Sequence, residues 1–234
     1  MTTELFLDGA NLEEILKFKD DDRIKGFTTN PSLMRKANVK DYLGFAQNLK
    51  RKIPNDKHVS LEVISDDLSE MKRQATEIGN ISDNFYAKIP ITNTKGECTG
   101  PIIKQLGDNG IKVNVTAIMT SDQVYKLKNF LSTSTASVVS VFAGRISDTG
   151  INANSVMSEC KYMLSKNKAC QLLWASCREV YSIYEANNCN CDIITASSDI
   201  INKYYTLHNK DLKDFSLETV KDFYKDALEA NYVL

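Results

Sequence analysis

The chain has 234 residues, with 29 lysines and arginines against 30 aspartates and glutamates, so its net charge is −1. The two signs are interspersed, which argues against a nucleic-acid partner or an electrostatic membrane anchor and points to small-molecule partners. No apolar stretch reaches the length of a membrane span and the N-terminal residues lack a signal-peptide pattern, so we expect a cytoplasmic protein. This length suits one large domain, for which the α/β barrel is a common solution.

Eight short apolar or β-branched runs recur along the chain and are typical of buried strands. They cover residues 5–7, 24–27, 59–63, 85–89, 111–115, 138–142, 172–174 and 193–194. Segments with helical spacing lie between them, over residues 39–53, 66–81, 121–131, 152–164 and 178–187. Alternating strands and helices favour parallel pairing, and eight such units close a barrel. We therefore predict an α/β fold, a single (β/α)8 TIM barrel over residues 1–234 with an extra C-terminal helix.

The extra helix is expected over residues 216–230, where Val220, Phe223, Tyr224 and Leu228 fall on one face and Ser216 is the expected N-cap. An exposed apolar face needs a partner surface. We expect the extension over residues 209–234 to pack on a neighbouring subunit, although the same helix could fold back on its own barrel.

The six cysteines are spread through the chain without a paired CxxC spacing, so we expect reduced thiols: Cys98, Cys160, Cys170, Cys177, Cys189 and Cys191. Cys189 and Cys191 invite a metal interpretation. The chain has only two histidines, His58 and His208, and neither is near this pair in sequence. We expect no metal site.

Strand residues alternate between the lumen of a barrel and its helix layer, so polar residues on the lumen side need a reason. Lys88 puts Tyr86 on the lumen side of its strand, and Ser176 likewise puts Trp174 there. Because barrel enzymes carry their active sites at the C-terminal ends of the strands, one ring of candidates surrounds a single pocket. The ring consists of Asp8, Asn30, Glu62, Lys88, Asn114, Thr116, Ser140 and Ser176. For the serines and asparagines, helix capping is an alternative role.

Lys88 is the most informative member of this ring because it lies within the apolar run 85–90. Burial disfavours an ammonium group, and an uncharged lysine is the nucleophile that forms Schiff bases with ketones. The alternative is a structural lysine whose charge reaches water past the strand end. An amine, two carboxylates, and several hydroxyls and amides around one pocket are the groups that imine chemistry on a polyhydroxy ketone requires.

Arg145 and Arg178 follow neighbouring strands and could reach one phosphate, which a guanidinium binds through two parallel hydrogen bonds. Backbone donors of the helix that begins near Ser176 would add to this site. A solvated surface pair of arginines is the alternative interpretation.

Seven segments together resemble the transaldolase family, and more closely its short subfamily, which includes the fructose-6-phosphate aldolases. The two most specific are Gly26-Phe27-Thr28-Thr29-Asn30-Pro31-Ser32-Leu33, through its block Thr28 to Ser32, and Ala87-Lys88-Ile89-Pro90, through its block Lys88 to Pro90. The others are Phe6-Leu7-Asp8, Ser60-Leu61-Glu62-Val63, Asn114-Val115-Thr116, Phe142-Ala143-Gly144-Arg145 and Ala175-Ser176-Cys177-Arg178. The resemblance covers nearly the whole chain.

The resemblance implies a cofactor-free barrel in which Lys88 forms the Schiff base, Asp8 is the acid/base, and Glu62 and Thr116 position a catalytic water. It further implies sugar-phosphate substrates and the following substrate-binding residues: Thr28, Asn30, Asn114, Ser140, Phe142, Arg145, Ser176 and Arg178. A homo-oligomer, a pentamer or decamer, is implied as well.

Glu62 and Phe142 decide between the two activities of the family. Aldolases of the short subfamily tend to carry Gln and Tyr at these positions, so the chain resembles transaldolases. Phenylalanine cannot donate a proton to the enamine, which then survives until an acceptor aldose phosphate arrives. We expect a transaldolase of the non-oxidative pentose phosphate pathway. Two alternatives stay open: an aldolase that releases free dihydroxyacetone, and a sugar-phosphate binding protein without turnover.

Overall fold

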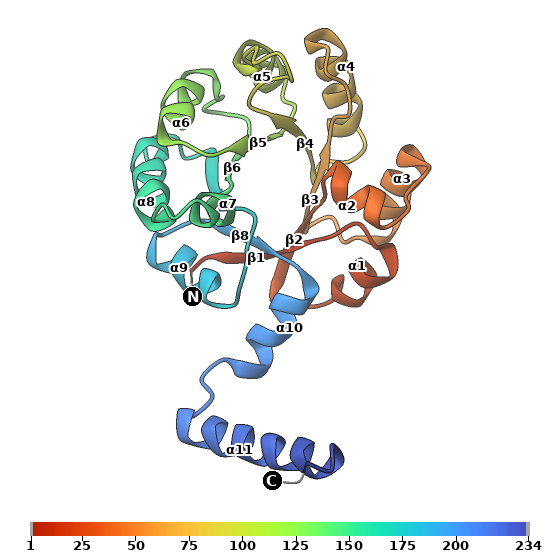
Figure 1. The fold of residues 1–234 in the computed structure, drawn as a ribbon. Coiled ribbons are helices and arrows are strands. Elements are labelled where there is room, and N and C mark those ends of the chain that lie inside the picture. The colour runs from red at the N-terminus through yellow and green to blue at the C-terminus, as the bar shows by residue number, and fades with distance from the viewer. Residues whose placement is uncertain (1, 233–234) are drawn as a thin grey trace.

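The computed structural model describes residues 2–232, and its centre is a closed barrel of eight parallel strands in chain order (Figure 1). The strands are β1 (Glu4–Asp8), β2 (Ile24–Thr28), β3 (His58–Glu62), β4 (Phe85–Pro90), β5 (Val113–Ile118), β6 (Ser137–Val141), β7 (Cys170–Trp174) and β8 (Ile193–Ala196). The first strand pairs with the last, which closes the barrel. The predicted fold class is confirmed.

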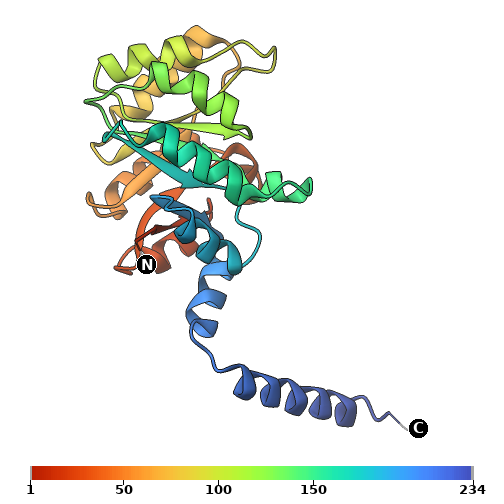
Figure 2. The ribbon, with the colours of Figure 1, turned by 90° about the vertical axis from the view of Figure 1, so that its left-hand side faces the viewer.

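Helices surround the barrel and follow every strand (Figures 1 and 2). They are α1 (Leu12–Phe18), α2 (Pro31–Lys36), α3 (Tyr42–Lys52), α4 (Leu68–Gly79), α5 (Gly100–Asp108), α6 (Ser121–Leu127), α7 (Ala143–Asp148), α8 (Ala153–Leu164), α9 (Tyr181–Asn188) and α10 (Ser198–Leu207), with a 3-10 turn η1 (Lys128–Phe130). One further helix, α11 (Leu212–Glu229), follows α10. Five of these, α1, α2, α5, α7 and α10, lie outside the segments in which helical spacing was recognised in the sequence. Most are too short to show a clear 3.6-residue pattern.

Short polar side chains begin many of the helices. The side chains of Asn11, Asn30, Asp41 and Asp67 each accept a hydrogen bond from a backbone N–H in the first turn of the next helix. Such caps satisfy donors that have no partner inside the helix. Asn11, Asn30 and Asp67 lie soon after the ends of β1, β2 and β3, so these βα connections are short.

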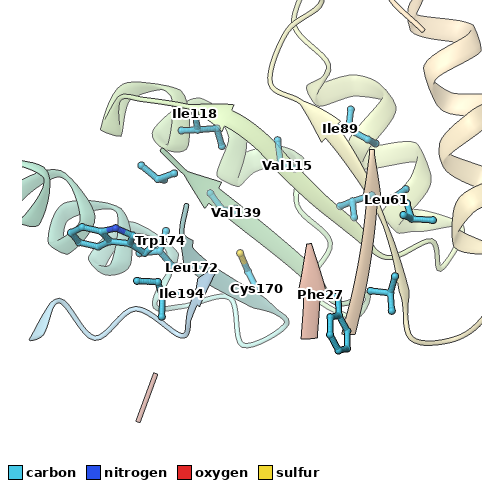
Figure 3. Close-up of a cluster of buried hydrophobic side chains, with 14 of the residues drawn as sticks. Phe27, Leu61, Ile89, Val115, Ile118, Val139, Cys170, Leu172, Trp174 and Ile194 are labelled. Atoms are coloured by element: carbon cyan, nitrogen blue, oxygen red, sulfur yellow. The ribbon is translucent and has the colours of Figure 1, made fainter. Parts of the chain in front are cut away.

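Two apolar layers hold the barrel. The larger lies between strands and helices and includes Phe27, Leu61, Ile89 and Trp174 (Figure 3). The smaller lies among lumen-facing residues of the strands: Phe6, Val138, Leu173, Ala175 and Ile193, with Tyr86 and Phe142 against them. On β4 the predicted alternation therefore holds.

On β7 the predicted alternation is wrong. Trp174 belongs to the outer layer, while Leu173 and Ala175 belong to the lumen cluster. The strand ends at Trp174, and Ser176 adopts a positive φ of 62°. Because the backbone turns there, counting back from Ser176 by twos assigns the wrong face.

The helix α11 extends away from the barrel (Figures 1 and 2). Its large apolar residues are exposed, among them Phe223, Tyr224 and Leu228. The predicted N-cap at Ser216 is wrong, because Asp211 caps this helix by accepting hydrogen bonds from the backbone N–H groups of Lys213 and Asp214. No described helix combines the length and apolar character needed to cross a bilayer.

Candidate active site

A pocket opens at the C-terminal ends of the strands, and eight of the predicted site residues line it. These are Asp8, Thr28, Asn30, Lys88, Ser140, Phe142, Arg145 and Ser176, joined by Leu173, Ala175 and Thr195. The residues come from loops and strand ends far apart in sequence. The barrel topology brings them together, as expected for this face of the fold.

Lys88 is 5% exposed and lies near the end of β4. Its Nζ atom donates a hydrogen bond of 2.8 Å to the Thr29 carbonyl and lies 3.2 Å from Oε2 of Glu62. Glu62 is the partner of Lys88 in the β3–β4 register, which explains the contact. The amine is thus buried, oriented and next to a carboxylate that can exchange protons with it.

Asp8 ends β1 and shares the pocket with Lys88. Burial raises the pKa of the Asp8 carboxyl, while the charge of Lys88 and a hydrogen bond from Thr28 oppose this change. The Thr28 hydroxyl donates to Oδ1 of Asp8 over 2.7 Å. A carboxyl with a raised pKa can carry a proton during a reaction, which suits an acid/base.

A hydrogen-bonded chain crosses the lumen behind the pocket. Ser140 donates to Oδ1 of Asn114 over 2.6 Å, and Nδ2 of Asn114 donates to the Ser60 hydroxyl over 2.9 Å. That hydroxyl lies 2.5 Å from Nε2 of His58, whose ring stacks on Tyr86 at 3.8 Å between centroids. Asn114 therefore lies behind Ser140, and its amide has both ends engaged.

Besides Asn114 and Arg178, two predicted residues do not line the pocket, Glu62 and Thr116. Glu62 reaches Lys88 from β3, and its own backbone carbonyl accepts a hydrogen bond of 2.6 Å from the Tyr42 hydroxyl. Thr116 is buried, and its hydroxyl has no hydrogen-bonding partner among residues 2–232. An unpaired buried hydroxyl is costly unless a bound molecule satisfies it, so a polar ligand at this position would be stabilised.

The predicted phosphate residues come from α7 and from the loop after β7, which touch each other. The Arg145 guanidinium lies 5.0 Å from the centre of the Phe142 ring, at the pocket edge. Gly144 of α7 lets the helix meet this loop, because a Cβ atom there would lie 1.7 Å from the Ser176 carbonyl oxygen. Arg178 does not line the pocket and instead forms a 2.5 Å ion pair with Asp148, in which both side chains are about half exposed.

Several residues of this region were not predicted from the sequence. Thr195, Leu173 and Ala175 line the pocket, and His58 ends the polar chain. The predicted eighth strand stopped at residue 194, one residue before Thr195. Extending it by two residues would have placed that hydroxyl on the lumen side.

Asn30 has a second role besides lining the pocket. Its side-chain oxygen accepts a hydrogen bond of 3.0 Å from the Leu33 backbone and caps α2. The capping role considered for the asparagines is therefore real at this position. The cap fixes the Asn30 side chain and leaves its amide N–H groups available to a ligand.

Fold and site together define a (β/α)8 barrel protein with a buried, carboxylate-paired lysine at the catalytic face. A family model described as Transaldolase/Fructose-6-phosphate aldolase matches residues 5–232. A probable transaldolase of Nitrosopumilus maritimus is 33% identical over 204 residues, which are 86% of each chain. A probable transaldolase of Methanococcus maripaludis is 31% identical over 216 residues, covering 92% of this chain and 94% of the relative. The chain belongs to the transaldolase/fructose-6-phosphate aldolase family, as the resemblance predicted.

A solved structure of a putative fructose-1,6-biphosphate aldolase from Coccidioides immitis has the same fold. It aligns with a TM-score of 0.56 at 10% sequence identity, over 90% of this chain and 82% of that chain. The family membership rests on the family model and the relatives, and this structural likeness supports the barrel architecture.

Proposed function

We propose that the protein is a transaldolase. It would move a dihydroxyacetone unit from a ketose phosphate, sedoheptulose 7-phosphate or fructose 6-phosphate, to an aldose phosphate. The observation that carries this proposal is the placement of Lys88 between the Glu62 carboxylate and a pocket that Asp8 also lines. The reaction belongs to the non-oxidative pentose phosphate pathway, with the cytoplasm as its compartment.

In the proposed mechanism, the Lys88 amine attacks the ketone carbon and forms a carbinolamine. Loss of water, with Glu62 and Thr116 handling the proton transfers, gives an iminium ion. Asp8 takes the proton of the substrate hydroxyl one carbon beyond the bond that breaks. The electron pair of that carbon–carbon bond moves into the iminium, which leaves an enamine on Lys88 and releases an aldose phosphate.

The enamine then attacks the aldehyde of the acceptor aldose phosphate, and Asp8 returns its proton to the new hydroxyl. Hydrolysis of the resulting iminium frees the product and the Lys88 amine. Phe142 lines the pocket and brings no hydroxyl to protonate the enamine, which favours transfer over release of dihydroxyacetone. That no metal or cofactor takes part remains a prediction.

Substrate binding is assigned to the side chains around this reacting centre. Asn30 and Ser140, which line the pocket, would bind substrate hydroxyls, and Asn114 would act through the Ser140 hydroxyl that donates to it. Arg145 with Ser176 would bind the phosphate. Arg178 would join them after exchanging its exposed partner Asp148 for the phosphate, an exchange that costs little because exposed ion pairs are weak.

Borohydride reduction in the presence of fructose 6-phosphate tests the Schiff base. The wild-type chain should gain the mass of one reduced sugar, and Lys88→Met should gain none. Lys57→Met is the matched control, because Lys57 is also buried, at 6% exposure, and its Nζ atom also donates to a backbone carbonyl, that of Asp21. Asp8→Asn should trap the intact ketose and fail to cleave it. Equal trapping by Lys88→Met and wild type would refute the assignment.

A coupled assay for glyceraldehyde 3-phosphate separates the family's two activities. With fructose 6-phosphate as donor, we expect turnover in the presence of erythrose 4-phosphate and no sustained turnover in its absence. Accumulation of dihydroxyacetone without an acceptor would identify an aldolase. Absence of both trapping and turnover would favour a sugar-phosphate binding protein.

A homo-oligomer, a pentamer or decamer, is part of this proposal. The exposed apolar residues of α11 support it, because a helix face of this kind requires a covering surface in water. Sedimentation should show an oligomer for the full chain and smaller species for a Val220→Asp, Phe223→Asp double variant. A monomeric wild-type protein would contradict this part of the proposal.

A further inference from the structure

Two buried threonines and Asp8 form a short hydrogen-bonded chain that extends from β8 to the reacting centre. Thr195 and Thr28 are 4% and 2% exposed. Their hydroxyl oxygens lie 2.6 Å apart, and the Thr28 hydroxyl donates to Oδ1 of Asp8 over 2.7 Å. The three side chains come from β8, β2 and β1, where β1 is hydrogen-bonded to both of the other strands.

Proton counting gives this chain a direction. A hydroxyl group has one proton, and an ionised carboxylate can only accept. Thr28 donates its only proton to Asp8, so in the hydrogen bond between the threonines Thr195 must be the donor and Thr28 the acceptor. In this direction every hydroxyl proton has an acceptor.

The opposite direction is less favourable. A protonated Asp8 would donate to Thr28, Thr28 would donate to Thr195, and the Thr195 proton would then need a further acceptor. Within residues 2–232 the Thr195 hydroxyl makes no hydrogen bond except the one to Thr28. Because a buried donor without a partner costs free energy, the chain favours the ionised form of Asp8.

We propose that Thr195 and Thr28 are positioning residues that hold the Asp8 carboxylate in one orientation and keep it ionised until it takes the proton of the substrate hydroxyl. Thr28 would then orient Asp8 through its hydrogen bond, whereas the sequence predicted that Thr28 binds substrate directly. The proposal deepens the proposed function and rests on Asp8 as its acid/base.

Other charged and titratable groups also surround Asp8. Lys88 from β4 and Arg145 from α7 line the same pocket, and Cys177 interacts with Asp8 from the loop after β7. A second cavity that Asp8 lines also contains Glu14, Lys36 and Asp199, from α1, α2 and α10. The influence of these groups on the pKa of Asp8 is the same in wild type and in variants that change a single hydroxyl. The effect of the threonine chain is therefore measured as the difference between variant and wild type.

The test uses variants that replace a hydroxyl by a methyl group of similar size: Thr28→Val, Thr195→Val and the double variant. We expect Thr28→Val to move the acid limb of the kcat/KM profile upward by about one pH unit, since a hydrogen bond to a charged group is lost. Thr195→Val should move it in the same direction by less, because Thr28 still donates but is no longer polarised by a donor. The double variant should match Thr28→Val, because Thr195 acts through Thr28.

The matched control is Thr3→Val. Thr3 is buried, directly precedes β1 at the end of that strand opposite Asp8, and its hydroxyl donates to the Cys191 carbonyl over 2.8 Å. This variant also loses a buried hydroxyl and should leave the titration of Asp8 unchanged. An equal movement of the acid limb in the control would assign the effect to general disturbance of the barrel and overturn the proposal.

A second measurement separates this inference from the proposed function. The carboxyl of Asp8 is titrated directly by NMR in protein labelled with carbon-13 aspartate, with Asp8→Asn identifying the resonance. Movement of this titration by both threonine variants supports the chain whether or not the enzyme turns over. An unmoved titration in Thr195→Val, or effects of the two variants that add, would overturn the proposal. A moved titration with an unmoved acid limb would instead overturn Asp8 as the acid/base of the proposed reaction.

Discussion

The imidazole of His58, which is only partly exposed, makes the stability of the barrel depend on pH. Burial, reinforced by the positive charge of Lys112, lowers the pKa of His58 from 6.5 to about 3. The ring lies between Phe6 and Tyr86, with centroid distances of 5.0 and 3.8 Å, so a charged imidazole there would lose most of its hydration. The folded protein therefore keeps this ring neutral at pH values at which an unfolded chain would protonate it.

The sign and size of the effect follow from proton linkage. Between pH 6.5 and pH 3 the unfolded state binds a proton at His58 that the folded state does not bind. The free energy of unfolding therefore falls as pH falls through this window, by at most about 1.4 kcal/mol per pH unit. From pH 6.5 to pH 5 the loss reaches about 2 kcal/mol. This figure is an upper bound, because His58 keeps some accessible surface and the barrel can relax around a charged ring.

His58→Gln is the informative variant, because its amide oxygen can still accept a hydrogen bond from Ser60 while its side chain does not titrate. Urea unfolding, followed by the fluorescence of the single tryptophan Trp174, should give curves for wild type and variant that converge as pH falls from 6.5 to 5. Protein concentration is held constant so that any assembly contributes equally. His58→Phe, which retains a stacked ring but no acceptor for Ser60, should show a lower stability with the same reduced pH dependence.

Proton NMR provides the refuting result. The chain has only two histidines, so His58→Gln identifies the His58 resonance by its disappearance. Titration of this resonance between pH 6 and 7 in the folded protein would refute the reasoning. Parallel pH dependences of unfolding in wild type and His58→Gln would refute it as well.

Three further predictions concern the pocket. Gly144→Ala should raise KM for phosphorylated ketoses at least tenfold, because the new Cβ atom would push the Ser176 carbonyl away. Dihydroxyacetone, which has no phosphate, should still form an adduct that borohydride traps. Equal losses for both substrates would contradict a role in phosphate binding. Phe142→Tyr should gain acceptor-independent release of dihydroxyacetone, measured by product analysis, and no gain would remove the rationale for Phe142. Burial raises the pKa of the Cys177 thiol to about 11, so iodoacetamide at pH 8 should label it more slowly than the exposed Cys98. Peptide mapping measures the labelling, with Cys177→Ser as the control. Rapid labelling of Cys177 with loss of activity would indicate a reactive thiol.

Part of this site could be predicted because strand alternation is a local property. Given that Lys88 faces the lumen, Tyr86 must share its face, and the neighbouring strands supply Glu62 and Asn114 at the same level. The strand-end polar residues therefore predicted which side chains gather, and the TIM barrel followed from the number of strand and helix units.

Other features depend on interactions that a local pattern does not contain. Asp211 is the N-cap of α11, although Ser216 is an equally suitable residue type for this role. Only the path of the backbone decides which of the two side chains accepts hydrogen bonds from the first-turn N–H groups. Arg178 follows a strand end, as a phosphate ligand would, but its guanidinium pairs with Asp148 at the end of α7. Trp174 faces the helix layer and not, as was predicted, the lumen, because the turn at Ser176 breaks the alternation from which the prediction was made.

The pairing of Thr195 with Thr28 shows where sequence reasoning has to stop. The two residues are 167 positions apart, and their hydroxyls meet because β1, which pairs with β8 and with β2, brings the two ends of the barrel wall together. Alternation places a hydroxyl on the lumen side of a strand, but the identity of its partner depends on the stagger of all eight strands at closure. The role of Asp8 depends on that partner, because a donor to its carboxylate favours the ionised form and an acceptor favours the protonated form. Residue types at strand ends can thus identify a group as an acid/base, while the closure of the barrel decides in which protonation state it waits for the substrate.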